Sequence, residues 1–89
     1  MSYKVVIDRQ AAKALAKLPK KIQRQIGRKI DALAENPFPS GYELVQSTKD
    51  IYRIKSGNYR IAYTVRKKKL VVLVVRVRHR KDFYQYFAG

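Results

Sequence analysis

Cationic side chains that could bind and polarise a phosphate alternate with apolar residues along one stretch of this chain. Between Asp50 and Asp82 lie 31 residues, of which 11 are Lys or Arg and none is acidic. Lys and Arg side chains stabilise the negative charge that develops when a phosphodiester is attacked. Because apolar residues interleave with the charges, we expect the stretch to fold as a sheet with a positive field. Such a field indicates a polyanion, foremost a nucleic acid, as the partner.

Metal-free cleavage of RNA has three chemical requirements, which these residues meet unequally. A base must remove the proton of the ribose 2′-hydroxyl, the anionic phosphorane must be stabilised, and the leaving 5′-oxygen must be protonated. Cations meet the second requirement directly. Lys55 is a candidate base because the neighbouring charges of Arg53 and Arg60 favour its neutral form. His79 is the alternative, since an imidazole exchanges protons near neutral pH. It can equally be a neutral residue on the back of its strand.

A hairpin register predicts how the first cations are placed. If residues 57–58 form a two-residue turn, Lys55 lies directly opposite Arg60. A slip by one residue would mix polar and apolar side chains on each face. The predicted faces are apolar (Tyr52, Ile54, Ile61 and Tyr63) and cationic (Arg53, Lys55 and Arg60). Like charges across a hairpin destabilise it. The cationic face therefore suggests a bound anion, with an ordinary solvated surface as the alternative.

Periodicity and turn residues predict the elements around this hairpin. Asp8 suits the N-cap of a first helix, and Asn36-Pro37 ends a second one whose apolar residues recur at helical spacing. The expected elements are strands at 3–7, 51–55, 58–66 and 69–77, an extended piece at 42–46, helices at 9–18 and 19–36, and one or two helical turns at 80–87. We predict an α+β fold with an N-terminal strand, a two-helix hairpin, an antiparallel sheet with the helices packed on one face, and a short C-terminal helix.

Size and composition exclude several classes of protein. The 89 residues predict a single domain spanning 1–89. There is no cysteine and only one histidine, so a disulfide scaffold is excluded and neither a metal site nor a small-molecule cofactor is expected. A net charge of +15 calls for a neutralising partner. The longest apolar run, Leu70–Val75, is far too short for a membrane helix, and the N-terminus lacks a signal-peptide pattern, which predicts a cytoplasmic protein.

Three segments together resemble the RelE toxins of the RelE/ParE superfamily. They are Ile51-Tyr-Arg-Ile-Lys55, Gly57-Asn-Tyr-Arg-Ile-Ala-Tyr63 and Val77-Arg-His-Arg-Lys-Asp-Phe-Tyr84, and the N-terminal strand and helical hairpin fit as well. The resemblance covers essentially the whole chain. It implies a toxin of a type II toxin–antitoxin system that cleaves mRNA in the ribosomal A site by metal-free attack of the 2′-hydroxyl. It also implies an acidic, RelB-like antitoxin that holds the toxin inactive.

The same resemblance implies roles for individual residues. Arg60 matches the phosphate-binding arginine of the family, and Lys55 matches one lysine of its catalytic pair. Arg80 matches the arginine after the last strand, and Tyr84 the aromatic residue that stacks on an mRNA base. Arg53 stands where the second lysine usually lies, and it can stabilise charge but not act as a base. The candidate residues are Lys55, Arg60, Arg80, Arg53, Tyr84 and His79 for catalysis, and Arg53, Arg78, Lys81 and Tyr86 for RNA binding.

Other interpretations remain open at this point. A ParE-like inhibitor of DNA gyrase would share the fold, although the matched site residues speak against it. A non-catalytic RNA- or DNA-binding module would bind without cleavage. Tyr84 and Tyr86 can simply pack the last helix onto the sheet. Lys67–Lys69 are interpreted as generic solvated charge at a turn. The weak acid–base set predicts poor cleavage of free RNA and dependence on a platform that orients the phosphate. The resemblance to the RelE toxins implies that this platform is the ribosome.

Overall fold

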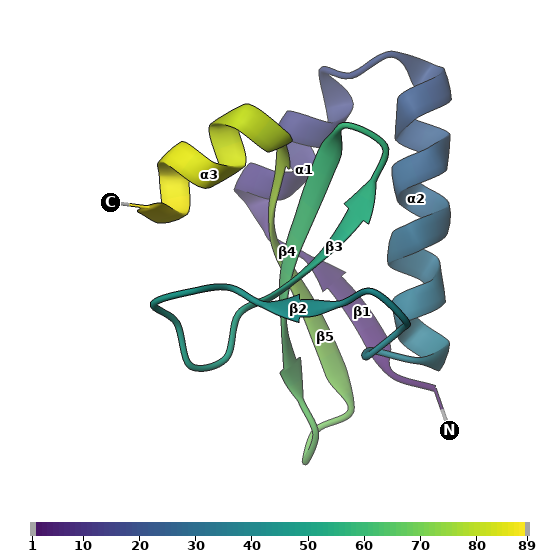
Figure 1. The fold of residues 1–89 in the computed structure, drawn as a ribbon. Coiled ribbons are helices and arrows are strands. Elements are labelled where there is room, and N and C mark those ends of the chain that lie inside the picture. The colour runs from purple at the N-terminus through teal and green to yellow at the C-terminus, as the bar shows by residue number, and fades with distance from the viewer. Residues whose placement is uncertain (1, 89) are drawn as a thin grey trace.

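All strands of the computed structural model, which describes residues 2–88, belong to one five-stranded sheet. The strand order is β1-β5-β4-β3-β2. Along the chain the elements are β1 (Lys4–Ile7), α1 (Arg9–Ala16), α2 (Lys20–Glu35), β2 (Glu43–Leu44), β3 (Tyr52–Ser56), β4 (Tyr59–Arg66), β5 (Val71–His79) and α3 (Arg80–Ala88) (Figure 1). The predicted α+β class and element order are therefore confirmed. The expected extended piece at 42–46 is reduced to the two residues of β2.

The sheet is antiparallel from β2 to β5, as predicted, but its other edge is parallel. β1 pairs with β5 in parallel, with Val5 beside Val72 and Ile7 beside Val74. Turn chemistry sets the direction of β3, β4 and β5 because tight hairpins join them. No such constraint acts between β1 and β5, which are separated by most of the chain. The parallel pairing makes β5 an inner strand, which agrees with its continuous apolar run.

The two N-terminal helices cover one face of the sheet and form the main core. The Asp8 carboxylate accepts a hydrogen bond from the Gln10 amide (3.2 Å), which caps α1 as predicted. The apolar stripe of α2 buries Ile26, Ile30 and Leu33 against the sheet. The buried members of this core are Ala11, Ile26, Ile30, Leu33, Ile54, Ile61, Tyr63, Val72, Val74 and Val77. None of the helices within residues 2–88 has the length and apolar character that crossing a membrane requires.

A second, smaller core lies on the opposite face, beneath α3. Phe83, which is 1% exposed, packs against Ala62 of β4 and Val45 of the segment after β2. Figure 1 shows α3 and α2 on opposite sides of the sheet. α3 contains nine residues and so exceeds the one or two turns expected from the sequence. The face predicted to be cationic is therefore partly covered by a helix and is not an open surface.

Candidate functional site

Three cations from three adjacent strands form a row across the face that carries α3. Lys55 of β3 lies opposite Arg60 of β4, which confirms the predicted hairpin register. On its other side Arg60 lies opposite Arg78 of β5. Neighbouring strands are about 4.8 Å apart, so the three side chains stand close together with like charges side by side. We call Lys55, Arg60 and Arg78 the cationic row.

A second row of arginines follows next to it. Arg53 and Arg76 lie on either side of Ala62. The position of Arg76 depends on an irregularity in β5, because the pairing with β4 shifts register between Ala62 and Tyr63. Such a bulge places an extra residue on one strand and turns a side chain to a new direction. The alternation of side chains along a strand therefore does not predict the direction of Arg76, and this residue is absent from the candidates proposed from the sequence.

Two carboxylates reach these arginines from outside the acid-free segment, so the face predicted to be cationic is partly neutralised. Glu43 lies opposite Arg53 in the sheet, and its Oε2 is 3.1 Å from Arg53 Nη2. Asp8 Oδ2 lies 3.6 Å from Arg76 Nη1. Both acids lie outside the acid-free segment 51–81. They come from β2 and from the end of β1, whose places in the sheet are set by long-range pairing.

Arg60 is held in a defined position. Its side chain is largely buried, with 7% of the residue exposed. Nη1 donates hydrogen bonds to the carbonyl oxygens of Gly57 and Tyr59, both at 3.0 Å. The tight turn that contains Gly57, with φ 58°, aims these carbonyls at the guanidinium. One side of the planar group is therefore anchored by the backbone, which leaves its other nitrogens in a fixed direction.

Four guanidinium nitrogens of this face are buried without a hydrogen-bond partner within residues 2–88. They are Arg53 Nη1 and the Nε atoms of Arg60, Arg76 and Arg78. A buried donor that lacks an acceptor costs about 1–3 kcal/mol. Carboxylates and phosphates are the acceptors that match arginine, often through two parallel hydrogen bonds. The face thus has unsatisfied donors that an anionic oxygen would complete.

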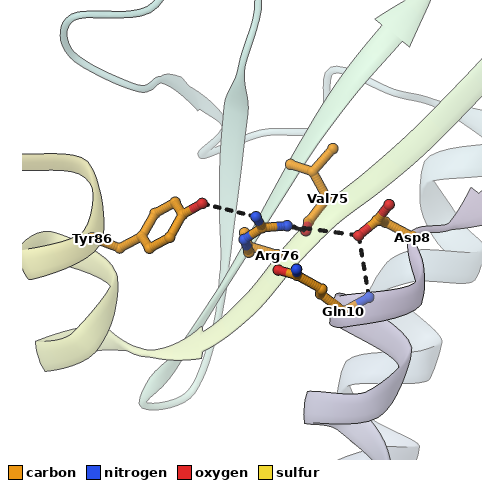
Figure 2. A network of polar contacts seen from close by, with 5 residues as sticks. All are labelled: Asp8, Gln10, Val75, Arg76 and Tyr86. Atoms are coloured by element: carbon orange, nitrogen blue, oxygen red, sulfur yellow. Dashed lines mark hydrogen bonds and ion pairs between the residues drawn. The ribbon is translucent and has the colours of Figure 1, made fainter.

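Tyr86 connects α3 to two arginines of β5, and Figure 2 shows its contact with Arg76. Its ring lies against two guanidinium groups, with centroid distances of 5.0 Å to Arg76 and 4.6 Å to Arg78. Its hydroxyl accepts a hydrogen bond from Arg76 Nη2 at 2.8 Å. Arg76 in turn faces Asp8 at the start of α1, so three elements meet at this arginine. Sequence reasoning missed Asp8 and Arg76 because the contacts join residues far apart in the chain.

Tyr84 differs from Tyr86 in having a free ring. It is 51% exposed, and within residues 2–88 its one aromatic contact is edge-to-face with Phe83 at 6.2 Å. It lines a cavity of about 280 Å³ between α3 and the β2 segment, together with Leu44, Arg53 and Phe87. An exposed aromatic face beside a guanidinium is suited to stacking on a planar base. The ring of Tyr86, by contrast, is occupied by the two arginines.

The remaining candidate residues are Arg80, Lys81 and His79, and they lie in different places relative to the cationic row. Arg80 and Lys81 are exposed at the start of α3, and the Arg80 amide donates to the Asn58 carbonyl (2.7 Å), which fixes this end beside the β3–β4 turn. His79 pairs with Tyr59, on the face of the main core, and its ring meets Tyr59 at 5.5 Å. His79 Nδ1 accepts from the Lys81 amide at 3.3 Å. His79 is thus not brought to the cationic row, and a catalytic role for it stays a prediction.

Comparisons with known proteins show what this chain is similar to. A family model described as the ParE toxin of type II toxin–antitoxin system, parDE, matches residues 5–84. A putative RelE-like toxin protein from Escherichia coli is 35% identical over 88 residues, covering 94% of this chain and 92% of that protein. The mRNA interferase toxin RelE of Escherichia coli K12 is 33% identical with the same coverage.

Solved structures agree with these sequence matches. The toxin of the archaeal RelE–RelB complex from Pyrococcus horikoshii superposes with a TM-score of 0.79 at 33% identity, over 90% of this chain and 97% of that one. The isolated Escherichia coli RelE toxin superposes with a TM-score of 0.77 at 30% identity, over 96% and 94% of the two chains. The likeness therefore extends over nearly the whole fold, including the strands that carry the cationic row.

Proposed function

This chain belongs to the RelE toxins of the RelE/ParE superfamily of type II toxin–antitoxin systems, and from this we propose that it is an endoribonuclease that cleaves mRNA in the ribosomal A site. Relatives of similar length are named mRNA interferases. The single observation that carries the proposal is the cationic row, with buried guanidinium donors that lack an acceptor. A scissile phosphate supplies the anionic oxygens that these donors require.

The proposed reaction is attack by the ribose 2′-hydroxyl on the adjacent phosphorus. The 2′-oxygen forms a bond to phosphorus, and the bond from phosphorus to the 5′-oxygen breaks. The products are a 2′,3′-cyclic phosphate and a 5′-hydroxyl end, with one proton lost by the 2′-hydroxyl and one gained by the 5′-oxygen. Arg60 binds the phosphate and stabilises the phosphorane, since its backbone contacts hold it ready before the reaction. Arg78 and Arg80 add positive charge around the same phosphate.

Lys55 is the proposed proton acceptor. It is exposed, and it stands directly beside Arg60 in the cationic row. Its place in the row, directly beside the arginine proposed to bind the phosphate, supports this role. Arg53 contributes charge, partly neutralised by Glu43 in the free protein. Water or a group of the ribosome donates the proton to the 5′-oxygen.

Tyr84 is proposed to stack on an mRNA base beside the scissile phosphate. Its half-exposed ring and the neighbouring cavity support this assignment over Tyr86. Arg78, Lys81 and Arg53 contact the RNA backbone around it. A site with such a weak acid–base pair depends on precise placement of the substrate, and orientation can contribute about 7–11 kcal/mol. The ribosome supplies that placement.

The proposed regulator is an acidic antitoxin similar to RelB. Several structural neighbours are complexes of RelE with RelB. Carboxylates of an antitoxin would satisfy the same buried arginine donors that a phosphate satisfies. α3 stands over these donors, so we propose that the antitoxin lays an acidic amphipathic segment over the face or displaces this helix. Either mode would neutralise much of the net charge of +15.

The test adds the protein to ribosomes programmed with mRNA and maps new 3′ ends by primer extension. The wild type is expected to cut within the A-site codon, and an Arg60→Ala/Arg80→Ala variant is expected not to cut. Because the matching family model is that of ParE, supercoiling by DNA gyrase is measured in parallel. Intact mRNA with inhibited gyrase would replace the proposal with a ParE-like function. Binding without any cleavage would indicate a non-catalytic module, and cuts that persist in the double variant would refute the site assignment.

A further inference from the structure

A second basic region lies at the far end of the sheet, at the β4–β5 turn. Four consecutive cations, Arg66 to Lys69, are all exposed there. They border a groove whose other lining residues are Phe38, Tyr52, Val65 and Val71. Arg66 lies six residues beyond Arg60 on β4, which corresponds to about 20 Å along the strand. The groove is therefore separate from the cationic row, and the interpretation of these lysines as solvated charge overlooks its aromatic wall.

The aromatic wall is a cluster of rings that reaches the surface. Phe38 meets both Tyr42 and Tyr52 at centroid distances of 5.2 Å, and Tyr42 meets Tyr52 at 5.8 Å. Tyr42 is one of the large exposed apolar side chains of the protein. The cluster continues to the buried Tyr63, whose hydroxyl donates to the Pro37 carbonyl at 2.7 Å. This hydrogen bond anchors the loop that carries Phe38.

The basic side of the groove is also held in place. Leu70 adopts a φ of 55°, which is uncommon for a residue with a side chain, and its carbonyl accepts from the Lys4 amide at 2.7 Å. The turn is thereby tied to β1 as well as to its own strands. Lys67 Nζ lies 5.3 Å from the centroid of the Phe38 ring, so a cation and the aromatic wall are in contact. Charge and ring surface thus belong to one site.

We infer that this groove, formed by Phe38, Tyr52 and the cations of Arg66–Lys69, is a second binding site that takes single-stranded RNA. Proteins that hold single strands combine a cationic groove for the backbone with aromatic rings on which bases stack. No acidic side chain lines the groove among residues 2–88, whereas Glu43 and Asp8 partly neutralise the arginines beside the cationic row. The inference rests on the proposed action on RNA. The groove holds RNA away from the scissile phosphate and adds affinity without chemistry.

The test compares two triple variants that remove equal charge from exposed lysines. Lys67→Gln/Lys68→Gln/Lys69→Gln alters the groove, and Lys13→Gln/Lys17→Gln/Lys20→Gln alters the surface around α1. Binding of a fluorescein-labelled single-stranded RNA of twelve nucleotides is followed by fluorescence anisotropy over a range of salt concentrations. Three lost phosphate contacts should lower the slope of log affinity against log salt by about 2, at roughly 0.7 per contact on a single strand. The control variant should lose at most a small part of this.

A second measurement examines the aromatic wall. The wild type should bind the RNA more tightly than an abasic strand of the same length, by about 5- to 150-fold for one stacked base. Phe38→Leu should lower this preference, to which Tyr84 can also contribute, while it keeps a large apolar side chain. Photocrosslinks from 5-iodouridine should map to the 38–52 segment. The inference would be overturned by equal losses of affinity in the two lysine variants or by crosslinks outside the 38–52 segment. It would also be overturned if the abasic strand bound as tightly as the RNA, because the groove would then be a site for any anion, acidic peptides included.

The two proposals fail in different ways. If the groove variant loses no affinity while wild-type protein cuts mRNA on the ribosome, the groove inference is wrong and the proposed function stands. If wild-type protein binds RNA through the groove but leaves ribosomal mRNA intact, the proposed function is wrong and the groove inference stands. Should Phe38→Leu fail to fold, the lysine variants and the crosslinks decide the question, because exposed lysines contribute little to stability.

Discussion

Replacing Arg60 by lysine tests whether the geometry of this residue matters beyond its charge. In the wild type one guanidinium nitrogen donates to the Gly57 and Tyr59 carbonyls, both at 3.0 Å. The remaining nitrogens stay in the plane that this anchoring defines, and in the proposed mechanism they bind the phosphate. A lysine ammonium at the same place is a single point of charge. It can bind the carbonyls or the phosphate, but it cannot bridge them as arginine does.

The magnitude follows from these contacts. Loss of one preorganised donor to a developing anion costs about 2.7–4 kcal/mol, or roughly 10²–10³ in kcat. We therefore expect Arg60→Lys to be slowed almost as much as Arg60→Ala. Two opposing effects keep the change in stability of Arg60→Lys small. The variant loses two hydrogen bonds worth about 0.5–1.5 kcal/mol each, but it also removes the buried, unpaired Nε of Arg60, which costs the wild type about 1–3 kcal/mol. The free energy of unfolding should shift by less than about 2 kcal/mol.

The assay is single-turnover cleavage of mRNA on programmed ribosomes with the toxin at saturating concentration. Arg24→Lys makes the same exchange at an exposed position of α2 and serves as the matched control. Urea denaturation of each variant separates lost chemistry from lost folding. If Arg60→Lys cleaves within about 10-fold of the wild type, charge alone suffices and the preorganisation argument is refuted. If it unfolds at the urea concentration that leaves Arg24→Lys folded, Arg60 is chiefly a structural residue.

Three further predictions concern other residues. Tyr84→Ala should slow single-turnover cleavage by about 5- to 150-fold through loss of about 1–3 kcal/mol of base stacking. Its urea midpoint should equal that of the wild type because the ring is half exposed. Burial raises the pKa of the Tyr63 hydroxyl above its ordinary value of about 10. The folded state therefore holds this proton more tightly than the unfolded state, so the contribution of the hydroxyl to stability is complete below pH 10 and declines above it. Tyr63→Phe should be less stable than the wild type at pH 8, where the hydrogen bond to Pro37 is lost, and the difference should shrink at pH 11; a constant difference would contradict this. Glu43→Gln leaves Arg53 without its carboxylate and should tighten binding of single-stranded RNA by up to about 5-fold at low salt, as expected from an exposed ion pair; weaker binding would show that Glu43 supports the site.

Local patterns made much of the fold predictable. The stripe of Ile26, Ile30 and Leu33 identified the buried face of α2, and Asp8 marked the start of α1. The first hairpin was predictable residue by residue, because only one register keeps its apolar and cationic side chains on separate faces. For the same reason the sequence alone sufficed to place Lys55 and Arg60 side by side.

Features that depend on distant parts of the chain were not predictable in this way. The bulge in β5 breaks strand alternation, so the direction of Arg76 could not be read from spacing. Glu43 reaches the site because β2 pairs with β3, and Asp8 reaches it because β1 pairs with β5. No turn residue specifies either pairing. Lys67–Lys69 had no visible partner because Phe38 lies far away in the sequence and is brought to them only by packing.

The amino-acid sequence by itself determined the cationic character of this protein, its element order and the pairing of Lys55 with Arg60, since these follow from composition and from periods of two and 3.6 residues. The tertiary structure alone decided which charged and aromatic side chains have partners within the protein. It neutralises Arg53 with Glu43, places Tyr86 against Arg76 and Arg78, leaves the ring of Tyr84 exposed and puts His79 on the other face. The contacts of Glu43 and Tyr86 join separate elements, for which a single sequence contains no local periodic signal. The face of His79 follows strand alternation, which the sequence left as one of two open interpretations.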